Sequence, residues 1–175
     1  MAGSARPESS ATAPEFFSGA WADAVGGALT AGPSERAREG RLQMYWDFFG
    51  LVKSGYPASW ALGCRDLPGP PGDSAGQSGD GGGPRYLFVQ WDGGRVTDCR
   101  IAGPDAPRAS YVLGMDYAGW KALHEGYGAQ RTVMYRKILL EQGELLEFFK
   151  AIYFFVECLA VIGAVPARYP ALAAR

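Results

Sequence analysis

The stretch from Leu145 to Ile162 constrains the fold more than any other part of the chain, because as a helix it is apolar on nearly all sides. At about 100° of rotation per residue, Glu147, Lys150 and Glu157 fall within an arc of roughly 80°. The rest of the circumference carries two adjacent apolar stripes, the first made of Phe148, Ile152, Phe155 and Leu159 and the second of Phe149, Tyr153, Val156 and Ala160. One stripe can pack against a core, so the second requires a cavity or a partner.

A membrane-spanning helix would also be apolar nearly all round. Here, however, three charged residues lie within the stretch, two of them near its middle, and they cost several kcal/mol on insertion scales. The stretch also follows segments that alternate like the strands of a sheet with one face in water. We therefore predict no membrane span.

The composition is that of a globular domain, and it excludes several classes of function. At 175 residues, of which 47% are hydrophobic and 20% charged, the chain fits one domain with tails. Lys and Arg number 17 against 18 Asp and Glu, and this net charge of -1 gives no electrostatic case for nucleic acid. Cys64, Cys99 and Cys158 lack C-x-x-C spacing and His124 is the only histidine, so we expect no metal site and no cofactor. Three scattered thiols, without a secretion signal in 1–13, favour a cytoplasmic protein.

Turn residues divide the chain into segments. We predict a disordered tail over 1–12, one domain over 13–165 and a C-terminal tail over 166–175. The segment 67–84, which is almost entirely Gly, Pro, Ser and Asp, is predicted to be a flexible loop inserted into that domain.

Helix and strand patterns alternate within the domain. A capping box at Thr12 and Glu15 predicts a first helix that Gly32 ends, and Ser34 begins a second helix that Gly55 ends. Strands are expected over 58–64, 86–91, 95–101, 110–115 and 137–141, with a hairpin turn at 92–94. Asp116 is placed to cap a short helix around Trp120, and a further helical turn is expected over 129–135.

Several short motifs follow one another in a fixed order between Trp91 and Glu144. They are the hairpin Trp91–Val96, the run Tyr111–Trp120, the tripeptide His124-Glu125-Gly126 and the segment Met134–Glu144. The last three give a strand, an acid-capped helix with an aromatic residue, a glycine, a short helix and a strand ending in Gly143, before an apolar C-terminal helix. This order resembles the sterol carrier protein type 2 domain family, over roughly 16–165, with Glu144 where the family usually has Asp.

The resemblance implies a single α+β domain, in which helices cover one face of a five-stranded, mostly antiparallel sheet. Between sheet and helices it implies an apolar tunnel that binds a hydrophobic small molecule, of lipid, sterol or fatty-acyl type, for carriage or sequestration. The tunnel residues implied by the resemblance are Leu113, Trp120, Met134, Ile138, Phe148, Ile152, Phe155 and Leu159, and the aromatic pattern of the N-terminal half adds Trp46, Phe49 and Trp60. The sequence does not fix which helix stripe faces the sheet.

Three alternatives stay open. The five Trp, nine Tyr and nine Phe residues could fill a dense core, or the second stripe could form a homodimer or dock a partner. An enzyme could use the same tunnel to fold and then cyclise or isomerise a hydrophobic, polyketide-like natural product. The sequence shows no catalytic triad, and we assign no catalytic residue. A polar residue without a structural partner in the cavity would favour the enzyme, the candidates being His124, Glu141, Arg136 and Tyr111.

Overall fold

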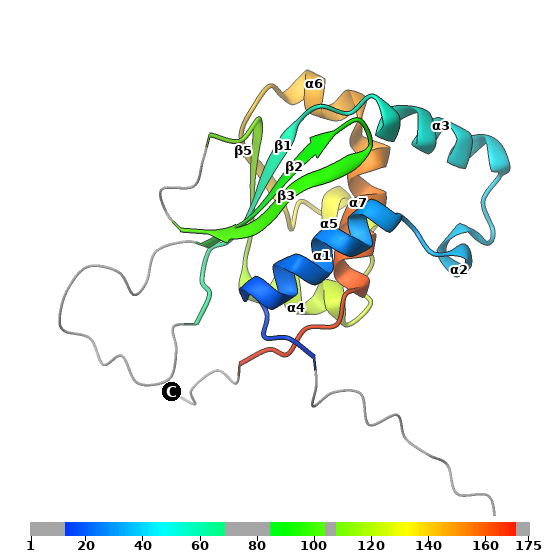
Figure 1. Ribbon diagram of the computed structural model, residues 1–175. Helices are drawn as coiled ribbons and strands as arrows, with labels where there is room; N and C mark the ends of the chain where they lie inside the picture. Colours follow the sequence, from blue (N-terminus) through cyan, green and yellow to red (C-terminus); the bar gives the residue numbers. More distant parts are fainter. Residues whose placement is uncertain (1–12, 69–84, 104–107, 171–175) are drawn as a thin grey trace, which may run out of the picture.

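Five strands form one mixed sheet, in the order β3-β2-β1-β4-β5 (Figure 1). The structure is a computed structural model that describes residues 13–68, 85–103 and 108–170. The strands are β1 (Ser59–Cys64), β2 (Arg85–Asp92), β3 (Arg95–Ala102), β4 (Tyr111–Met115) and β5 (Leu139–Gln142). β1 pairs in parallel with β4, and all other neighbouring strands pair antiparallel. The prediction of a five-stranded, mostly antiparallel sheet is therefore confirmed.

The hairpin between β2 and β3 follows directly from its turn residues. Gly93 and Gly94 have φ angles of 54° and 83°. Positive φ at both central positions is characteristic of the type I′ turn of two-residue hairpins, and glycine adopts it without a steric cost. The predicted turn at 92–94 is therefore present, and it sets the pairing of Asp92 with Arg95.

Helices cover one face of the sheet (Figure 1). The helices of the described residues are α1 (Gly19–Ala31), α2 (Glu35–Arg38), α3 (Gln43–Ser54), α4 (Tyr117–His124), α5 (Ala129–Met134), α6 (Leu145–Lys150) and α7 (Ile152–Ala164), and of these the short α2 lies away from the sheet. α1 packs across β3, where Gly26 allows close approach: a Cβ at Gly26 would lie 2.9 Å from the Cβ of Cys99. Asp116 caps α4 as predicted, with its Oδ1 accepting a hydrogen bond of 2.7 Å from the Gly119 amide.

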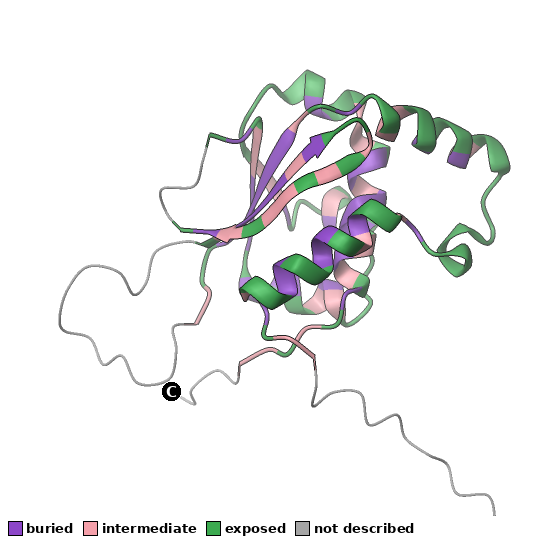
Figure 2. Cartoon of the chain, in the orientation of Figure 1, coloured by how far each residue is buried: buried purple, intermediate pink, exposed green. Residues whose placement is uncertain are grey.

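The core lies between the sheet and α7, and it is rich in aromatic residues. Figure 2 shows buried residues along the central strands and on the inner sides of α1 and α7. Trp60 of β1 is fully buried, and its ring lies 5.5 Å from the ring of Trp91 and 5.2 Å from that of Phe155. Much of the aromatic content therefore fills a dense core, as one of the alternatives expected.

The long apolar helix is interrupted, which corrects the prediction of one continuous helix over 145–162. Ala151 has φ -109° and ψ 20°, and its amide donates to the Phe148 carbonyl at 3.2 Å, which closes α6 before α7 begins. The break allows Phe148 and Phe155 to face each other, with their rings 4.9 Å apart. It also separates the charges that a continuous helix would align: Glu147 and Lys150 pair in solvent, whereas Glu157 is buried.

The first helix begins later than the capping box predicts. Thr12 lies outside the described residues, and α1 is capped by Ser18, whose hydroxyl accepts a hydrogen bond of 3.2 Å from the Trp21 amide. Phe16 and Phe17 precede the helix and are 3% and 2% exposed, so burial of both rings determines the path of the chain here. This burial outweighs the local preference for a helix starting near Glu15.

The second predicted helix is also divided. Ser34 caps the short α2, and the chain turns at Gly40, where φ is 80°, before α3 begins at Gln43. Glycine permits this left-handed turn, so the break occurs there.

Residues 166–170, predicted to begin a tail, lie against the start of the domain. The Arg168 amide donates to the Pro14 carbonyl at 2.8 Å, and the Phe16 amide donates to the Arg168 carbonyl at 2.9 Å. The predicted tail over 1–12 and nearly all of the predicted loop over 67–84 lie outside the described residues. Of the helices in the described ranges, none has the length and apolar content needed to span a bilayer.

Candidate ligand-binding site

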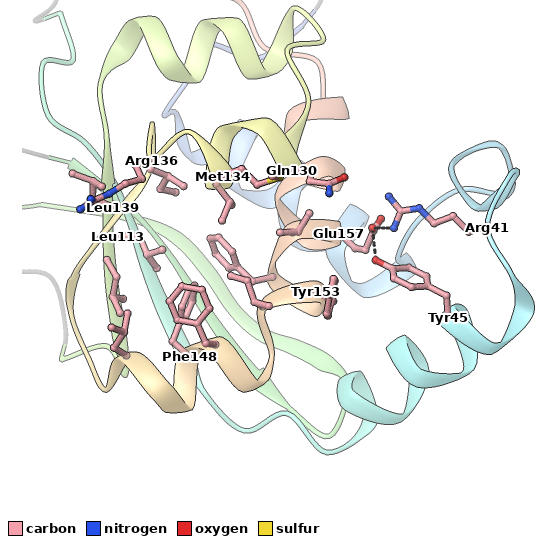
Figure 3. Close-up of a pocket in the computed structure, with 18 residues that line it drawn as sticks. Arg41, Tyr45, Leu113, Gln130, Met134, Arg136, Leu139, Phe148, Tyr153 and Glu157 are labelled. Atoms are coloured by element: carbon pink, nitrogen blue, oxygen red, sulfur yellow. Dashed lines mark hydrogen bonds and ion pairs between the residues drawn. The ribbon is translucent and has the colours of Figure 1, made fainter.

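A pocket of about 990 Å³ lies between the β4–β5 end of the sheet and helices α5, α6 and α7 (Figure 3). It is lined by Arg41, Tyr45, Leu113, Gln130, Val133, Met134, Arg136, Ile138, Leu139, Leu140, Leu145, Phe148, Phe149, Ile152, Tyr153, Phe155, Val156 and Glu157. Most of these side chains are aliphatic or aromatic. The pocket is therefore large and apolar enough to enclose a hydrophobic small molecule.

The inner wall of the pocket comes from the first stripe of the apolar stretch and from the sheet. Phe148 and Phe155 are 4% and 1% exposed, and both contact the main hydrophobic core. Leu113 projects from β4, and Ile138 leads into β5. The structure thus assigns the first stripe to the sheet side, a point that the sequence left undecided.

The outer rim of the pocket consists of large apolar side chains that remain in solvent. Leu145 and Phe149 are both 51% exposed, Tyr153 is 61% exposed and Met134 is 68% exposed. Leu145 and Phe149 lie on α6, Tyr153 on α7 and Met134 at the end of α5. These residues come from three helices, so the apolar lining continues outward to an exposed apolar margin.

One end of the pocket is polar, and its central group is the buried carboxylate of Glu157 on α7. Its Oε1 accepts hydrogen bonds from Nη1 of Arg41 and from the hydroxyl of Tyr45, the latter at 2.7 Å. The Arg41 guanidinium also lies over the Tyr45 ring, 4.6 Å from its centroid. The ion pair and the hydrogen bonds offset the cost of burying the carboxylate. They join α7 to Arg41 in the loop before α3 and to Tyr45 on α3.

The environment of Tyr45 keeps its phenol protonated. Burial, followed by the hydrogen bond to Glu157 and the charge of that carboxylate, raises the pKa of Tyr45 to about 12. At any pH well below this pKa, the hydroxyl is therefore protonated and acts as a hydrogen-bond donor.

Arg136 lies at the opposite end of the pocket from Arg41 (Figure 3). Its φ of 54° places it in the left-handed region, where the chain leaves α5 and turns toward β5. Its side chain is exposed, and no ion pair joins it to another of the described residues.

Six of the eleven predicted site residues lie in this pocket: Leu113, Met134, Ile138, Phe148, Ile152 and Phe155. The other five, Trp46, Phe49, Trp60, Trp120 and Leu159, lie in the hydrophobic core instead. Trp120, for example, is fully buried and donates a hydrogen bond of 3.1 Å from Nε1 to the Gly63 carbonyl. These five side chains belong to the main hydrophobic core, and the pocket lies beside that core at the β4–β5 end of the sheet.

Two of the four polar residues that would favour an enzyme are held by structural contacts away from the pocket. His124, which lies on α4, packs among aromatic rings, and Glu141 forms an ion pair of 2.8 Å with Arg65. Tyr111 does not line the pocket either, and its ring packs 5.2 Å from that of Phe148. Only Arg136 lies where that alternative requires it.

Sequence reasoning missed the polar end of the pocket. Glu157 shares one charged arc of the apolar stretch with Glu147 and Lys150, and helical periodicity alone places such an arc in solvent. The position of Glu157 in the middle of the apolar stretch 152–162 is a local sign of a buried charge with a partner, since a charged residue is rarely buried alone. The partners themselves lie 112 and 116 positions away in the sequence, and no local pattern identifies them.

Within the described ranges, no cluster of three or more His, Cys, Asp or Glu side chains is arranged to hold a metal ion. The three cysteines are free thiols, and burial raises the pKa of Cys64 and of Cys99 to about 12.

Comparison with known proteins supports the fold. No family model matches the sequence, and no curated protein matches it. A crystal structure of sterol carrier protein 2 aligns with a TM-score of 0.60 and 20% identity, over 86% of this chain and 99% of the other. A conserved hypothetical protein of Thermus thermophilus, for which a sterol carrier role has been suggested, aligns with a TM-score of 0.60 and 18% identity, over 91% of this chain and 95% of the other. The chain therefore has the fold of sterol carrier protein 2, as the sequence resemblance predicted.

Proposed function

We propose that the protein binds a hydrophobic small molecule, of lipid, sterol or fatty-acyl type, in the pocket between β4, β5 and helices α5 to α7, for carriage or sequestration. The observation that carries this proposal is the pocket of about 990 Å³ with its apolar wall. Natural ligand sites fall in the range of about 300 to 1,000 Å³ and are lined mainly by apolar side chains.

Burial of apolar ligand surface would provide most of the affinity. Each Å² of apolar surface removed from water contributes about 25 cal/mol, before the cost of association is subtracted. The exposed margin of Leu145, Phe149 and Tyr153 extends this contact beyond the inner wall. The shared fold agrees with such a role, since sterol carrier protein 2 is named for carrying sterols.

The catalytic alternative has less support from the site. Glu157 is the buried acidic group in the pocket, and its Oε1 is engaged by Arg41 and Tyr45. Cyclisation by orientation alone would still use the same cavity. Binding is therefore the common requirement of both alternatives, and it is the property to test first.

The test is direct measurement of binding, with one variant that fills the pocket and one matched control. Val156 lines the pocket, whereas Val161 lies further along α7, does not line it, and is likewise half-buried. We expect native mass spectrometry of the purified protein to show a co-purified lipid, and Nile red to bind with enhanced fluorescence. Val156→Trp should reduce Nile red binding at least tenfold, and Val161→Trp should not.

Failure of the wild-type protein to bind Nile red or any lipid would contradict the proposal. Equal loss of binding in the two variants would also contradict it, provided that circular dichroism shows both to be folded.

A further inference from the structure

The carboxylate of Glu157 offers one oxygen that the protein itself does not use. Oε1 accepts both hydrogen bonds of the cluster, from Arg41 and from Tyr45. Among the described residues, none donates a hydrogen bond to Oε2. The side chain is only 6% exposed, and it lines the pocket. Among the described residues, Oε2 is not one of the fully buried polar atoms that lack a partner, so it keeps access to the pocket, and a ligand group that donates to it there forms a charge-assisted hydrogen bond.

We propose that the ligand is a hydrophobic alcohol whose hydroxyl group donates a hydrogen bond to Oε2 of Glu157. This inference rests on the proposed function and specifies its ligand class. The apolar body of such a molecule lies against Phe148, Phe155 and Val156, and its hydroxyl lies at the polar end of the pocket.

The contacts of Arg41 distinguish an alcohol from an acid. A ligand carboxylate at this end would face the Glu157 carboxylate, and two like charges repel strongly in a poorly hydrated site. Arg41 is the cation within reach, but its Nη1 is held by Glu157 and its guanidinium lies over the rings of Tyr45 and Trp46, 4.6 and 5.7 Å from their centroids. Its charge is therefore already paired with Glu157, and a ligand carboxylate would have to compete with that residue for it.

Gln130 supplies a second polar group suited to a hydroxyl. It lines the pocket from α5 and lies toward the same end as Glu157 (Figure 3). Its amide can donate a hydrogen bond, and a hydroxyl oxygen can accept one while its proton is given to Glu157. An alcohol satisfies both groups, whereas an ether cannot donate to the carboxylate.

The experiment compares ligands that share one apolar chain and differ in the head group. Displacement of Nile red gives the dissociation constants of 1-dodecanol, dodecyl methyl ether and dodecanoic acid at pH 7.5. We expect the alcohol to bind about tenfold more tightly than the ether, because a buried hydrogen bond to a charged group discriminates by at least that factor. The acid should bind more weakly than the alcohol.

A conservative variant tests the assignment to Glu157. In Glu157→Gln, the amide oxygen can still accept from Arg41 and Tyr45, but an NH₂ group replaces the free acceptor. The alcohol and the ether can then both accept a hydrogen bond, so the ratio of their dissociation constants should fall to about one. Glu147→Gln is the matched control, since Glu147 is exposed on α6 and does not line the pocket; its ratio should stay at the wild-type value.

Three results would overturn the inference. They are equal binding of alcohol and ether by the wild-type protein, a ratio that persists in Glu157→Gln, and tighter binding of the acid than of the alcohol, which would assign the head group to Arg136 or Arg41. The wild-type series is decisive even where the variant does not fold. If Nile red itself does not bind, the proposed function fails, and this outcome is distinct from a change in head-group preference.

Discussion

The hydroxyl of Tyr169 lies 2.7 Å from Nδ1 of His124, and this contact joins the end of the described chain to α4. The same nitrogen lies 3.0 Å from the carbonyl oxygen of Trp120. The imidazole ring is surrounded by aromatic rings, with centroids 5.7 Å away in Phe16 and 6.0 Å away in Trp21. One half-buried titratable side chain thus contacts segments from both ends of the domain.

Stability should fall in mild acid because of His124. Burial lowers the pKa of His124 in the folded state, and the backbone carbonyls of Trp120 and Val165 oppose this only in part. The pKa of histidine in the unfolded state is about 6.5, and above this pH the ring is neutral in both the folded and the unfolded state. Below it, the unfolded state binds more protons than the folded state, so stability is lost as the pH falls toward the lowered pKa of the folded state. The slope is at most about 1.4 kcal/mol per pH unit. Urea unfolding at pH 7.5 and 5.5 measures it, and His124→Gln should lose this contribution.

Removal of the Tyr45 hydroxyl should destabilise the protein. Tyr45→Phe deletes the donor to Glu157, and we expect a loss of about 1 kcal/mol in the free energy of unfolding. Tyr153→Phe is the control, since Tyr153 is 61% exposed and its hydroxyl makes no hydrogen bond to a described residue. Equal unfolding midpoints in urea for Tyr45→Phe and the wild type would contradict the assigned role of this bond.

Adjacent phenylalanines on α6 should differ in their effect on stability. Phe148 is 4% exposed and Phe149 is 51% exposed. Phe148→Ala removes buried aromatic surface and should cost about 3 kcal/mol, whereas Phe149→Ala should cost less than about 1 kcal/mol. Thermal unfolding followed by circular dichroism gives both values, and a larger effect at Phe149 would show that α6 is rotated relative to this structure.

Gly143 should tolerate a methyl group poorly. Its φ is 120°, and an added Cβ would lie 2.7 Å from the carbonyl oxygen of Ser110 and 2.6 Å from Cδ1 of Tyr111. Gly126 also has a positive φ, 94°, but a Cβ there meets nothing within 4 Å. We therefore expect Gly126→Ala to lower the free energy of unfolding by about 1 kcal/mol, through backbone strain alone. Gly143→Ala should lower it by roughly 2 kcal/mol more, because it adds a steric clash to the backbone strain. Chemical denaturation of both variants tests the difference.

Local patterns in the sequence predicted the parts of the fold that depend on neighbouring residues. The glycine pair at 93–94 gives the hairpin, and Asp116 caps α4, because both features are satisfied within a few residues. The break at Ala151 and the late start of α1 could not be predicted in this way. They depend on how Phe148 and Phe16 pack against distant partners, which outweighs helix propensity.

The candidate site shows the same division. The resemblance of the sequence to a known family implied Leu113, Ile138 and Phe155 as tunnel residues, and all three line the pocket. Neither an aromatic pattern nor a family resemblance distinguishes a residue that borders a cavity from one that fills the core beside it. Trp60, predicted from the pattern, and Trp120, implied by the resemblance, are both fully buried in the core. The ion pair of Arg41 and Glu157 joins residues 116 positions apart, so no local sequence pattern predicts it.

The parallel pairing of β1 with β4 bears on how the chain reaches its native state. Trp60 lies opposite Tyr111, and the whole β2–β3 hairpin lies between them in the sequence. The central ladder of the sheet therefore closes a long segment, whose loop entropy is lost before its contacts can form. We expect the hairpin to form early, β4 to dock late, and refolding to take on the order of milliseconds to seconds.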